Sequence, residues 1–321
     1  MIVLTGGAGF IGSCVLQKLN ENNLSDIIVV DHLGFGLKWK NLVGKKFHSY
    51  IHKDKFLLEL KGRRYDDEID NIIHLGACAD TTETNSDYII ENNLNYSKEL
   101  ALYSQRKNIG FLYASSAATY GNGEFGYSDL EFDKLKPLNP YGLSKHLFDL
   151  WLMDNGLDKL FTGLKFFNVF GPNEFHKGDM ASMIYKSFNQ INSSGKVKLF
   201  KSNHPDYKDG EQMRDFIYVK DVVEVIWKIF NRTDVHGIYN LGTGHARSWN
   251  DLVNAAFSAL NKKVNIEYID MPSSLANQYQ NFTQANMSKL NDTNCSISYS
   301  SLEESIKDYI QNYLMAVWRY I

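Results

Sequence analysis

Short apolar runs alternate with helical patterns through the first half of this chain of 321 residues. Amphipathic helices are predicted at 11–20 and 139–155, where apolar residues recur at helical spacing. The continuous apolar runs are short enough for buried strands, which are predicted at 2–4, 27–31, 71–77, 110–116 and 162–168. Strands that alternate with helices are typical of a parallel sheet covered by helices on both faces.

The pattern becomes looser after residue 171. A helix is predicted near 180–192, strands at 197–200 and 214–219, and a polar insertion at 203–212. We therefore expect an α/β fold with two unequal parts. Residues 1–170 should form a Rossmann-type, doubly wound parallel sheet, to which a later segment of about 214–245 returns, and residues 171–321 a smaller mixed α/β substrate domain.

A glycine-rich turn, Thr5-Gly-Gly-Ala-Gly-Phe-Ile-Gly12, directly follows the first predicted strand. Its glycines allow the backbone to approach a pyrophosphate at a helix N-terminus, where free N–H groups favour anions. The second strand ends on an acid, Asp31, 19 residues after Gly12. A strand before the turn, a helix after it and this acid together predict a dinucleotide site that binds NAD(P).

The sequence does not decide between NAD and NADP as the cofactor. Asp31 could accept the ribose 2′-hydroxyl of NAD and would repel a 2′-phosphate. However, His32, Lys38 and Lys40 follow within ten residues, and a lysine there could pair with the phosphate of NADP. The residues favour NADP, with NAD as the alternative.

A second motif, Tyr141-Gly-Leu-Ser-Lys145, lies in the first turn of the predicted helix at 139–155. Residues four apart share a helix face, so the Lys145 ammonium is expected to lower the pKa of the Tyr141 phenol towards neutrality. Ser116, at the end of the preceding strand, could bond a substrate oxygen while Tyr141 takes its proton. Lys145 could also reach the nicotinamide ribose. This order of residues predicts a nicotinamide-dependent enzyme that acts on an alcohol.

Charge, cysteine spacing and the length of the apolar runs limit the kinds of partner and the cellular location that we expect. The net charge of −3 gives no general reason to expect nucleic acid or an anionic membrane as a partner. The cysteines at positions 14, 78 and 295 have neither close pairing nor zinc spacing, so we expect free thiols, a reducing compartment and no metal. No apolar run approaches the ~20 residues that span a bilayer, and no signal peptide fits, so a cytoplasmic location is expected.

Several segments resemble the extended short-chain dehydrogenase/reductase family of nucleotide-sugar enzymes over essentially the whole chain. They are residues 5–12, 74–77, 115–121, 141–145, 168–172 and 214–221. Dehydratases of that family carry an Asp-Glu pair after the active-site hydroxyl residue, whereas Ala117 and Ala118 follow Ser116 here. The resemblance therefore implies an epimerase.

Residues 92–99, 176–182 and 279–285 are similar to the subgroup that interconverts the C6 epimers of ADP-heptose for lipopolysaccharide core assembly. This implies an ADP-heptose substrate, a transient ketone, a homo-oligomer that is a pentamer, and Lys177 as a second acid/base beside Tyr141. The alternatives are a UDP-sugar 4-epimerase and a nonenzymatic NAD(P) sensor, although a sensor would not need Ser116, Tyr141 and Lys145 together. His32 and the insertion at 203–212 depart from the family pattern.

The resemblance implies two sets of contacts. Those to the cofactor are Gly6, Gly9, Phe10, Ile11, Gly12, Asp31, His32, Lys38, Lys53, Leu75, Gly76, Ala77, Cys78, Ala79, Asn92, Tyr141, Lys145, Val169 and Lys177. Those to the substrate are Ser116, Asn168, Asp179, Lys186, Phe200, Lys201, Ser202, Asn203, Arg214 and Tyr279. Arg214 could fork onto the diphosphate, the alternative being an ion pair with Asp215 or Asp221.

Overall fold

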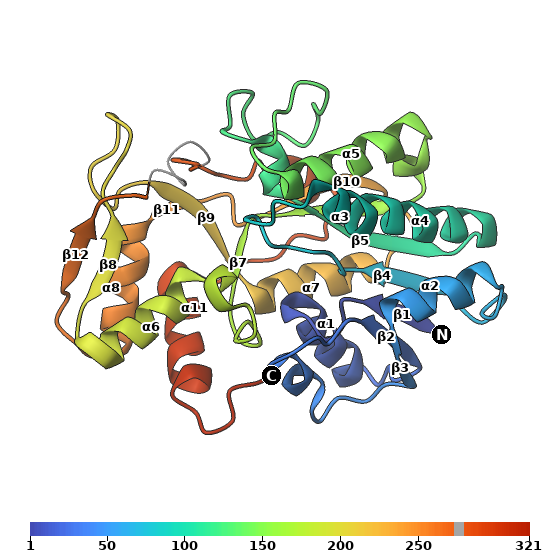
Figure 1. Ribbon diagram of the computed structural model, residues 1–321, viewed down its shortest axis with the longest axis horizontal. Coiled ribbons are helices and arrows are strands. Elements are labelled where there is room, and N and C mark those ends of the chain that lie inside the picture. The colour runs from blue at the N-terminus through green and yellow to red at the C-terminus, as the bar shows by residue number, and fades with distance from the viewer. Residues whose placement is uncertain (273–278) are drawn as a thin grey trace.

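The computed structural model describes residues 1–272 and 279–321, and the larger of its parts is built on a parallel sheet (Figure 1). Within the described residues this sheet has seven strands in the order β10-β6-β5-β4-β1-β2-β3. The strands are β1 (Ile2–Thr5), β2 (Ile27–Asp31), β3 (Ser49–His52), β4 (Asn71–His74), β5 (Gly110–Ser116), β6 (Thr162–Phe166) and β10 (Gly237–Leu241). The chain reverses its direction across the sheet between β1 and β4, which is where doubly wound sheets bind ligands. The predicted Rossmann-type fold is confirmed.

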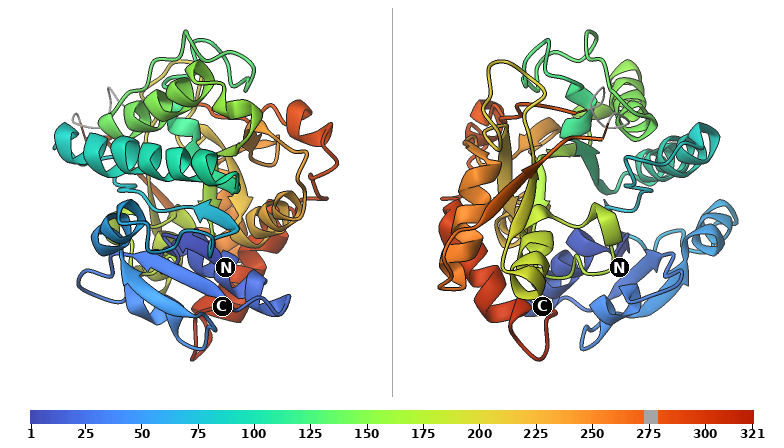
Figure 2. Two further views of the ribbon diagram at one scale, coloured as in Figure 1. Left: turned by 90° about the vertical axis from the view of Figure 1, so that its right-hand side faces the viewer. Right: turned by 60° about the vertical axis from the view of Figure 1, so that its left-hand side comes forward.

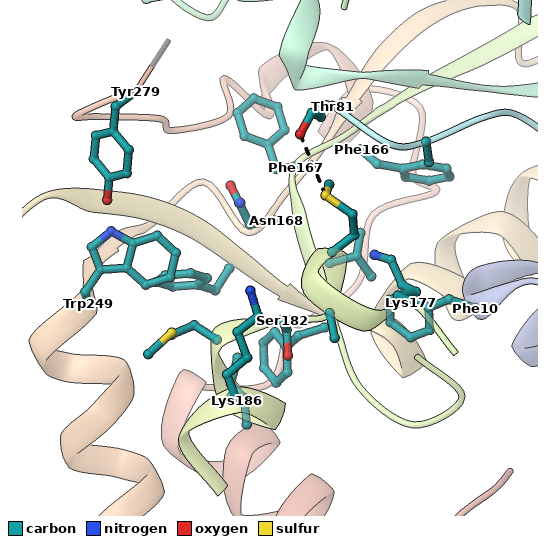
Figure 3. A pocket seen from close by; sticks show the side chains of 18 of the residues that line it. Phe10, Thr81, Phe166, Phe167, Asn168, Lys177, Ser182, Lys186, Trp249 and Tyr279 are labelled. Carbon is teal, nitrogen blue, oxygen red and sulfur yellow. Dashed lines mark hydrogen bonds between the residues drawn. The ribbon is translucent and has the colours of Figure 1, made fainter. Parts of the chain in front are cut away.

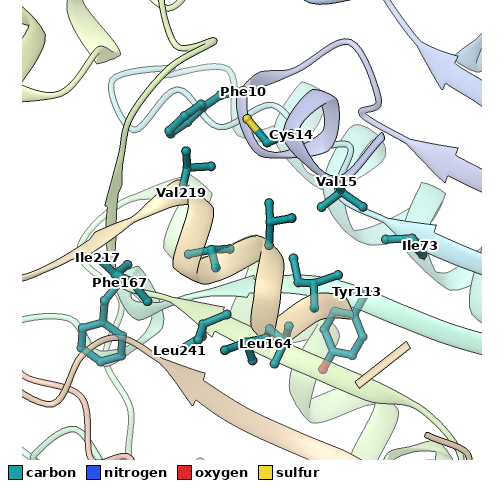
Figure 4. Packing of buried hydrophobic residues seen from close by; sticks show 14 of the residues in the cluster. Phe10, Cys14, Val15, Ile73, Tyr113, Leu164, Phe167, Ile217, Val219 and Leu241 are labelled. Atoms are coloured by element: carbon teal, nitrogen blue, oxygen red, sulfur yellow. The ribbon is translucent and has the colours of Figure 1, made fainter. Parts of the chain in front are cut away.

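Helices cover both faces of this sheet. Helices α1 (Phe10–Glu21) and α7 (Val219–Phe230) pack against each other on one face, and α4 (Tyr96–Lys107) and α5 (Pro140–Asp154) cover the other (Figure 1). Helix α2 (Lys53–Lys61) packs against β3, and the short α3 (Ser86–Ile89) against α5. Figure 4 shows Val15 of α1, Val219 of α7 and Leu164 of β6 in the buried core beneath the glycine turn.

The smaller part contains two short sheets. Strands β7 (Asn168–Phe170), β9 (Met213–Tyr218) and β11 (Ala246–Ser248) form one, and β8 (Val197–Phe200) pairs with β12 (Ile266–Ile269) in the other. Helices α6 (Met183–Ser194), α8 (Trp249–Ala259) and α11 (Leu302–Asp308) lie beside these sheets (Figure 2), and α10 (Ser288–Asn291) contacts β10. Within the segment 214–245, α7 and β10 lie with the large sheet, whereas β9 belongs to the three-stranded sheet.

The structure differs from the predicted elements where side-chain contacts override the local pattern. Strand β3 is an edge strand of four half-buried residues, so its sequence lacks the continuous apolar run of the other strands. Helix α6 begins at Met183 rather than near residue 180, because Ser182 caps it by accepting a hydrogen bond from Tyr185 N. No helix among the described residues is long and apolar enough to cross a membrane.

A buried ion pair lies behind the carboxyl end of β5. The Lys165 ammonium on β6 donates to the Asp149 carboxylate on α5 at 2.6 Å, and both side chains are 0% exposed. Asp149 also accepts hydrogen bonds from Tyr113 and Ser115 of β5, while Lys165 donates to Thr119. The pair therefore joins β5, β6 and α5, which carry Ser116 and Tyr141.

Lys165→Met is expected to lower the free energy of unfolding by about 3–5 kcal/mol, because removing one partner leaves the other charge buried and uncompensated. The control is Lys159→Met, an exposed lysine between α5 and β6, where a change within about 0.5 kcal/mol is expected. Urea unfolding followed by circular dichroism gives both values. Equal losses in the two variants would show that the buried pair contributes nothing particular to stability.

Candidate active site

The glycine turn between β1 and α1 forms a cradle that only glycine allows. A Cβ at Gly12 would lie 2.1 Å from the Gly6 oxygen, and one at Gly6, where φ is +69°, would lie 2.6 Å from Gly76 N. Helix α1 begins after Gly9 without a side-chain cap, so its first N–H groups are available to a ligand. The turn therefore fits a pyrophosphate, and the surrounding residues fit a nicotinamide dinucleotide.

The acid at the end of β2 is tied to this cradle. The Asp31 carboxylate accepts hydrogen bonds from Ala8 N at 2.8 Å, His32 N at 2.7 Å and the Lys38 ammonium at 2.5 Å. Lys38 also donates to the His32 oxygen at 2.9 Å. Lys38 is thus held beside Asp31 at the end of β2 rather than free in a solvated loop.

The predicted cofactor residues converge on two adjoining pockets at this edge of the sheet. One, of about 370 Å³, is lined by Gly6, Gly9, Phe10, Ile11, Gly12, Asp31, Lys38, Leu75, Gly76, Ala77, Ala79, Tyr141, Lys145 and Lys177, and we call it the glycine pocket. The other is smaller and is lined by Gly6, Asp31, His32, Lys38, Lys53, Gly76, Ala77, Cys78 and Asn92. Val169 lines a different, larger pocket.

That larger pocket, of about 730 Å³, lies between the two parts of the chain, and we call it the sugar pocket (Figure 3). The predicted substrate residues on its walls are Ser116, Asn168, Lys186, Phe200 and Tyr279. Phe10, Tyr141 and Lys177 line both this pocket and the glycine pocket. These side chains therefore lie where the two pockets meet.

Ser116, Tyr141 and Lys145 come together because β5 ends beside the first turn of α5. Asn139 caps that helix by accepting a hydrogen bond from Gly142 N at 2.8 Å, which fixes the turn that carries Tyr141. Burial raises the pKa of the Tyr141 phenol, and a hydrogen bond with Ser116 opposes that rise. Burial also lowers the pKa of Lys145 to about 8.

The expectation that Lys145 lowers the pKa of Tyr141 towards neutrality is wrong for this structure. The Lys145 ammonium donates to the Ala114 oxygen on β5 at 2.9 Å. Burial has the largest effect on the Tyr141 phenol, so its pKa rises. The helical spacing was correct, but the direction of the lysine side chain was set by the neighbouring strand.

Lys177 reaches the junction from the loop 171–182 between β7 and α6. Its ammonium lies 5.4 Å from the centroid of the Phe10 ring at the start of α1 (Figure 3). Burial lowers the pKa of Lys177, as expected for a desolvated lysine. Two proton-carrying side chains, Tyr141 and Lys177, thus line the same junction from different elements.

Arg214 lies behind the wall of the sugar pocket. Its guanidinium is 5.1 Å from the centroid of the Tyr279 ring and 5.6 Å from that of Trp249. Burial lowers the pKa of this arginine. The alternative of an ion pair is wrong, because Asp215 accepts hydrogen bonds from Thr243, Gly244 and Ala285, and Asp221 from Ser300.

Besides Arg214, four of the predicted substrate residues are absent from the walls of the sugar pocket. The Asp179 oxygen accepts a hydrogen bond from Lys186 at 2.6 Å, and Lys201 pairs with Asp270 at 2.9 Å. Ser202 N donates to Asp209, and Asn203 follows it in the loop after β8. Substrate contacts by these four residues stay a prediction.

Sequence reasoning missed several wall residues of the sugar pocket. They are Phe166, Phe167, Met180, Lys198 and Trp249. Thr81 donates to the Met180 sulfur at 3.9 Å across this wall (Figure 3). Apolar residues resemble core residues in sequence, and Lys198 lies at an exposed position of β8, so no local signal marks these residues as a binding surface.

Comparison with known proteins identifies relatives over nearly the full chain. The NAD dependent epimerase/dehydratase family matches residues 2–242. ADP-L-glycero-D-manno-heptose-6-epimerase from Nitratidesulfovibrio vulgaris (strain DP4) is 50% identical over 98% of each chain. The enzyme of the same name from Fusobacterium nucleatum is 47% identical over 98% of each chain.

A solved structure agrees with these sequence relatives. The crystal structure of Helicobacter pylori ADP-L-glycero-D-manno-heptose-6-epimerase superposes with a TM-score of 0.81 and 31% identity, over 97% of this chain and 95% of that one. The fold, the glycine cradle and the Ser-Tyr-Lys cluster agree with the family match. The chain therefore belongs to the NAD-dependent epimerase/dehydratase family, on the branch of the ADP-L-glycero-D-manno-heptose-6-epimerases.

Proposed function

We propose that this enzyme interconverts the two C6 epimers of ADP-glycero-D-manno-heptose through a transient ketone at C6. The observation that carries this proposal is the placement of Tyr141 and Lys177 where the glycine pocket meets the sugar pocket. The names of its full-length relatives support the same substrate.

When bound, the nicotinamide supplies a hydride acceptor that later returns the hydride, so the cycle is redox-neutral. One of Tyr141 and Lys177 takes the proton of the C6 hydroxyl as the ketone forms. Because C6 lies outside the sugar ring, rotation about C5–C6 turns the other face of the ketone to the cofactor. That rotation moves the oxygen towards the second acid/base, which donates the proton. Ser116 can hydrogen-bond the same oxygen at the first position.

We further propose NADP as the preferred cofactor, with Lys38 pairing with its 2′-phosphate. Lys38→Ala is expected to weaken NADP binding roughly tenfold or more, since hydrogen bonds to charged groups contribute about 1.5–3 kcal/mol. The loss of its charge would also leave Asp31 free to repel the phosphate. NAD binding should change less.

Calorimetric titration of the stripped protein with each dinucleotide measures this difference. Lys40→Ala is the control, because Lys40 lies over the Trp39 ring and lines neither cofactor pocket. Equal losses for NADP and NAD in Lys38→Ala would show that Lys38 does not contact the 2′-phosphate.

The function itself is tested by following epimer ratios by NMR after the protein is incubated with ADP-glycero-D-manno-heptose of either C6 configuration. Equilibration from both sides is expected, together with release of near-stoichiometric nicotinamide dinucleotide on denaturation. UDP-glucose serves as the competing substrate. Its conversion at C4, with no change in the ADP-heptose, would favour the UDP-sugar 4-epimerase instead. Tight dinucleotide binding without turnover of either sugar would favour a sensor.

Two further proposals concern assembly and location. The resemblance implies a homo-oligomer, a homopentamer by the family pattern, and the sequence pattern implies a cytoplasmic location. Light scattering of the purified protein measures the oligomeric state.

A further inference from the structure

A fully buried carboxylate lies at the base of the loop that carries Lys177. Glu174 is 0% exposed. Its carboxylate accepts hydrogen bonds from the Ser182 hydroxyl at 2.7 Å, from Ser182 N at 2.5 Å and from Gly171 N at 3.3 Å. These donors belong to the first and last residues of the loop 171–182. The carboxylate therefore bridges the two ends of the loop.

The backbone of Glu174 also sets the position of Lys177. The Glu174 oxygen accepts a hydrogen bond from Lys177 N at 3.0 Å, and the Lys177 oxygen accepts one from Met180 N at 3.0 Å. Lys177 thus occupies a tight turn inside a loop whose ends are joined by one side chain. From that turn its ammonium lies against the Phe10 ring.

The bridge is also a buried source of negative charge. Burial raises the pKa of Glu174, and the donors on Ser182 and Gly171 oppose that rise because they favour the charged form. Across the loop Tyr309 faces the same carboxylate, and burial and then the Glu174 charge raise the pKa of that phenol. A buried, hydrogen-bonded carboxylate at this position supplies charge as well as a tether.

Three effects act on the pKa of Lys177, and they do not all have the same direction. Burial, the largest, lowers its pKa, the Glu174 charge raises it, and the Lys186 ammonium on α6 lowers it. The other titratable groups around it in the glycine pocket are His176 on its own loop, and Tyr141 and Lys145 on α5. Asp31 at the end of β2, Lys38 seven residues later and Asp80 in the loop after β4 also line this pocket.

We propose that Glu174 is a positioning residue for Lys177. The Glu174 carboxylate closes the loop so that the Lys177 ammonium meets the substrate, and the negative charge of Glu174 keeps that buried lysine protonated. This inference rests on the proposed function, in which Lys177 exchanges a proton with the C6 oxygen. It assigns to Glu174 a role through Lys177 and no contact with the substrate.

The test compares Glu174→Gln with the wild-type holoenzyme, starting from each C6 epimer across a range of pH. Misplacement of a reacting group by about 1 Å can cost roughly 10²-fold, so we expect kcat to fall at least roughly tenfold. Loss of the negative charge should lower the pKa of Lys177. In the direction of epimerisation where Lys177 must start protonated, the alkaline limb of the pH–rate profile should therefore move to lower pH. In the opposite direction Lys177 must start deprotonated, so the acidic limb of that profile should move to lower pH.

Ser182→Ala separates the tether from the charge. It removes the hydroxyl that donates to Glu174 at 2.7 Å and also caps α6, but it keeps the carboxylate. We expect a lower kcat with limbs that move less than in Glu174→Gln, because Ser182 N and Gly171 N still donate to the carboxylate. Ser301→Ala is the matched control, because Ser301 caps α11 in the same way and lies outside the pocket walls, so kcat should stay within about twofold.

Each outcome decides one question. A wild-type enzyme that does not epimerise ADP-heptose contradicts the proposed function. An active wild type whose limbs do not move in Glu174→Gln, with dinucleotide still bound, overturns the inference about charge. If Glu174→Gln does not fold by circular dichroism, Ser182→Ala still decides, since an unchanged kcat there overturns the tether.

Discussion

Replacing Tyr141 with Phe is expected to reduce turnover from either C6 epimer by roughly 10²–10⁴-fold, the usual contribution of a positioned acid or base. The substitution removes one hydroxyl and leaves the ring at the junction of the two pockets. The Ser116 hydroxyl cannot replace it as an acid/base, because an unactivated serine hydroxyl does not ionise near neutral pH. It also accepts a hydrogen bond from Ala118 N at 3.1 Å. Binding of the dinucleotide should be nearly unchanged.

The measurement is the initial rate from each epimer by NMR, with the bound dinucleotide quantified after denaturation. Tyr268→Phe provides a matched control, because it removes a hydroxyl that donates to Asn250 at 3.0 Å from an exposed position of β12. Its rates should stay within about twofold of the wild type. Retention of activity within a few-fold in Tyr141→Phe would assign the proton to another group.

Lys177→Met is the second change with a large expected effect. Methionine keeps most of the bulk of the side chain against Phe10 but carries no proton, so turnover should fall by roughly 10²–10⁴-fold in both directions. Loss of turnover in both directions would indicate a two-base mechanism, because in each passage through the ketone one of the two side chains takes the proton and the other gives one. Affinity for ADP-heptose should be nearly unchanged.

Lys186→Met tests whether any lysine in the sugar pocket would behave alike. Lys186 lines the sugar pocket but not the glycine pocket, so we expect weaker ADP-heptose binding with most of the maximal rate retained. Calorimetric affinity and the maximal rate from each epimer separate the two lysines. Lost affinity with an intact maximal rate in Lys177→Met would make Lys177 a phosphate ligand instead.

The comparison of sequence and structure is closest where the signal is local. The strands at 27–31, 110–116 and 197–200 have the predicted bounds, because each is an apolar or alternating run ended by polar residues or glycine. The first helix starts one residue earlier than predicted, directly after Gly9. The Tyr141–Lys145 spacing also placed both residues on α5.

The sequence by itself therefore determined the doubly wound sheet, the glycine cradle and the order of the Ser116, Tyr141 and Lys145 side chains. Strand and helix periodicity and the need for glycine at tight approaches act over a few neighbouring residues, so they are readable without a fold. The family resemblance predicted the acid/base role of Lys177, but periodicity and spacing did not predict which residues surround it.

Only the tertiary structure decided how the site is completed. It placed Lys177 against Phe10, more than 160 residues earlier in the chain, and Arg214 between Tyr279 and Trp249. It also directed the Lys145 ammonium to a β5 carbonyl and buried Glu174 beneath the loop of Lys177. Burial and the direction of a side chain depend on packing between segments far apart in sequence, and these two quantities set the pKa values and the contacts of the site.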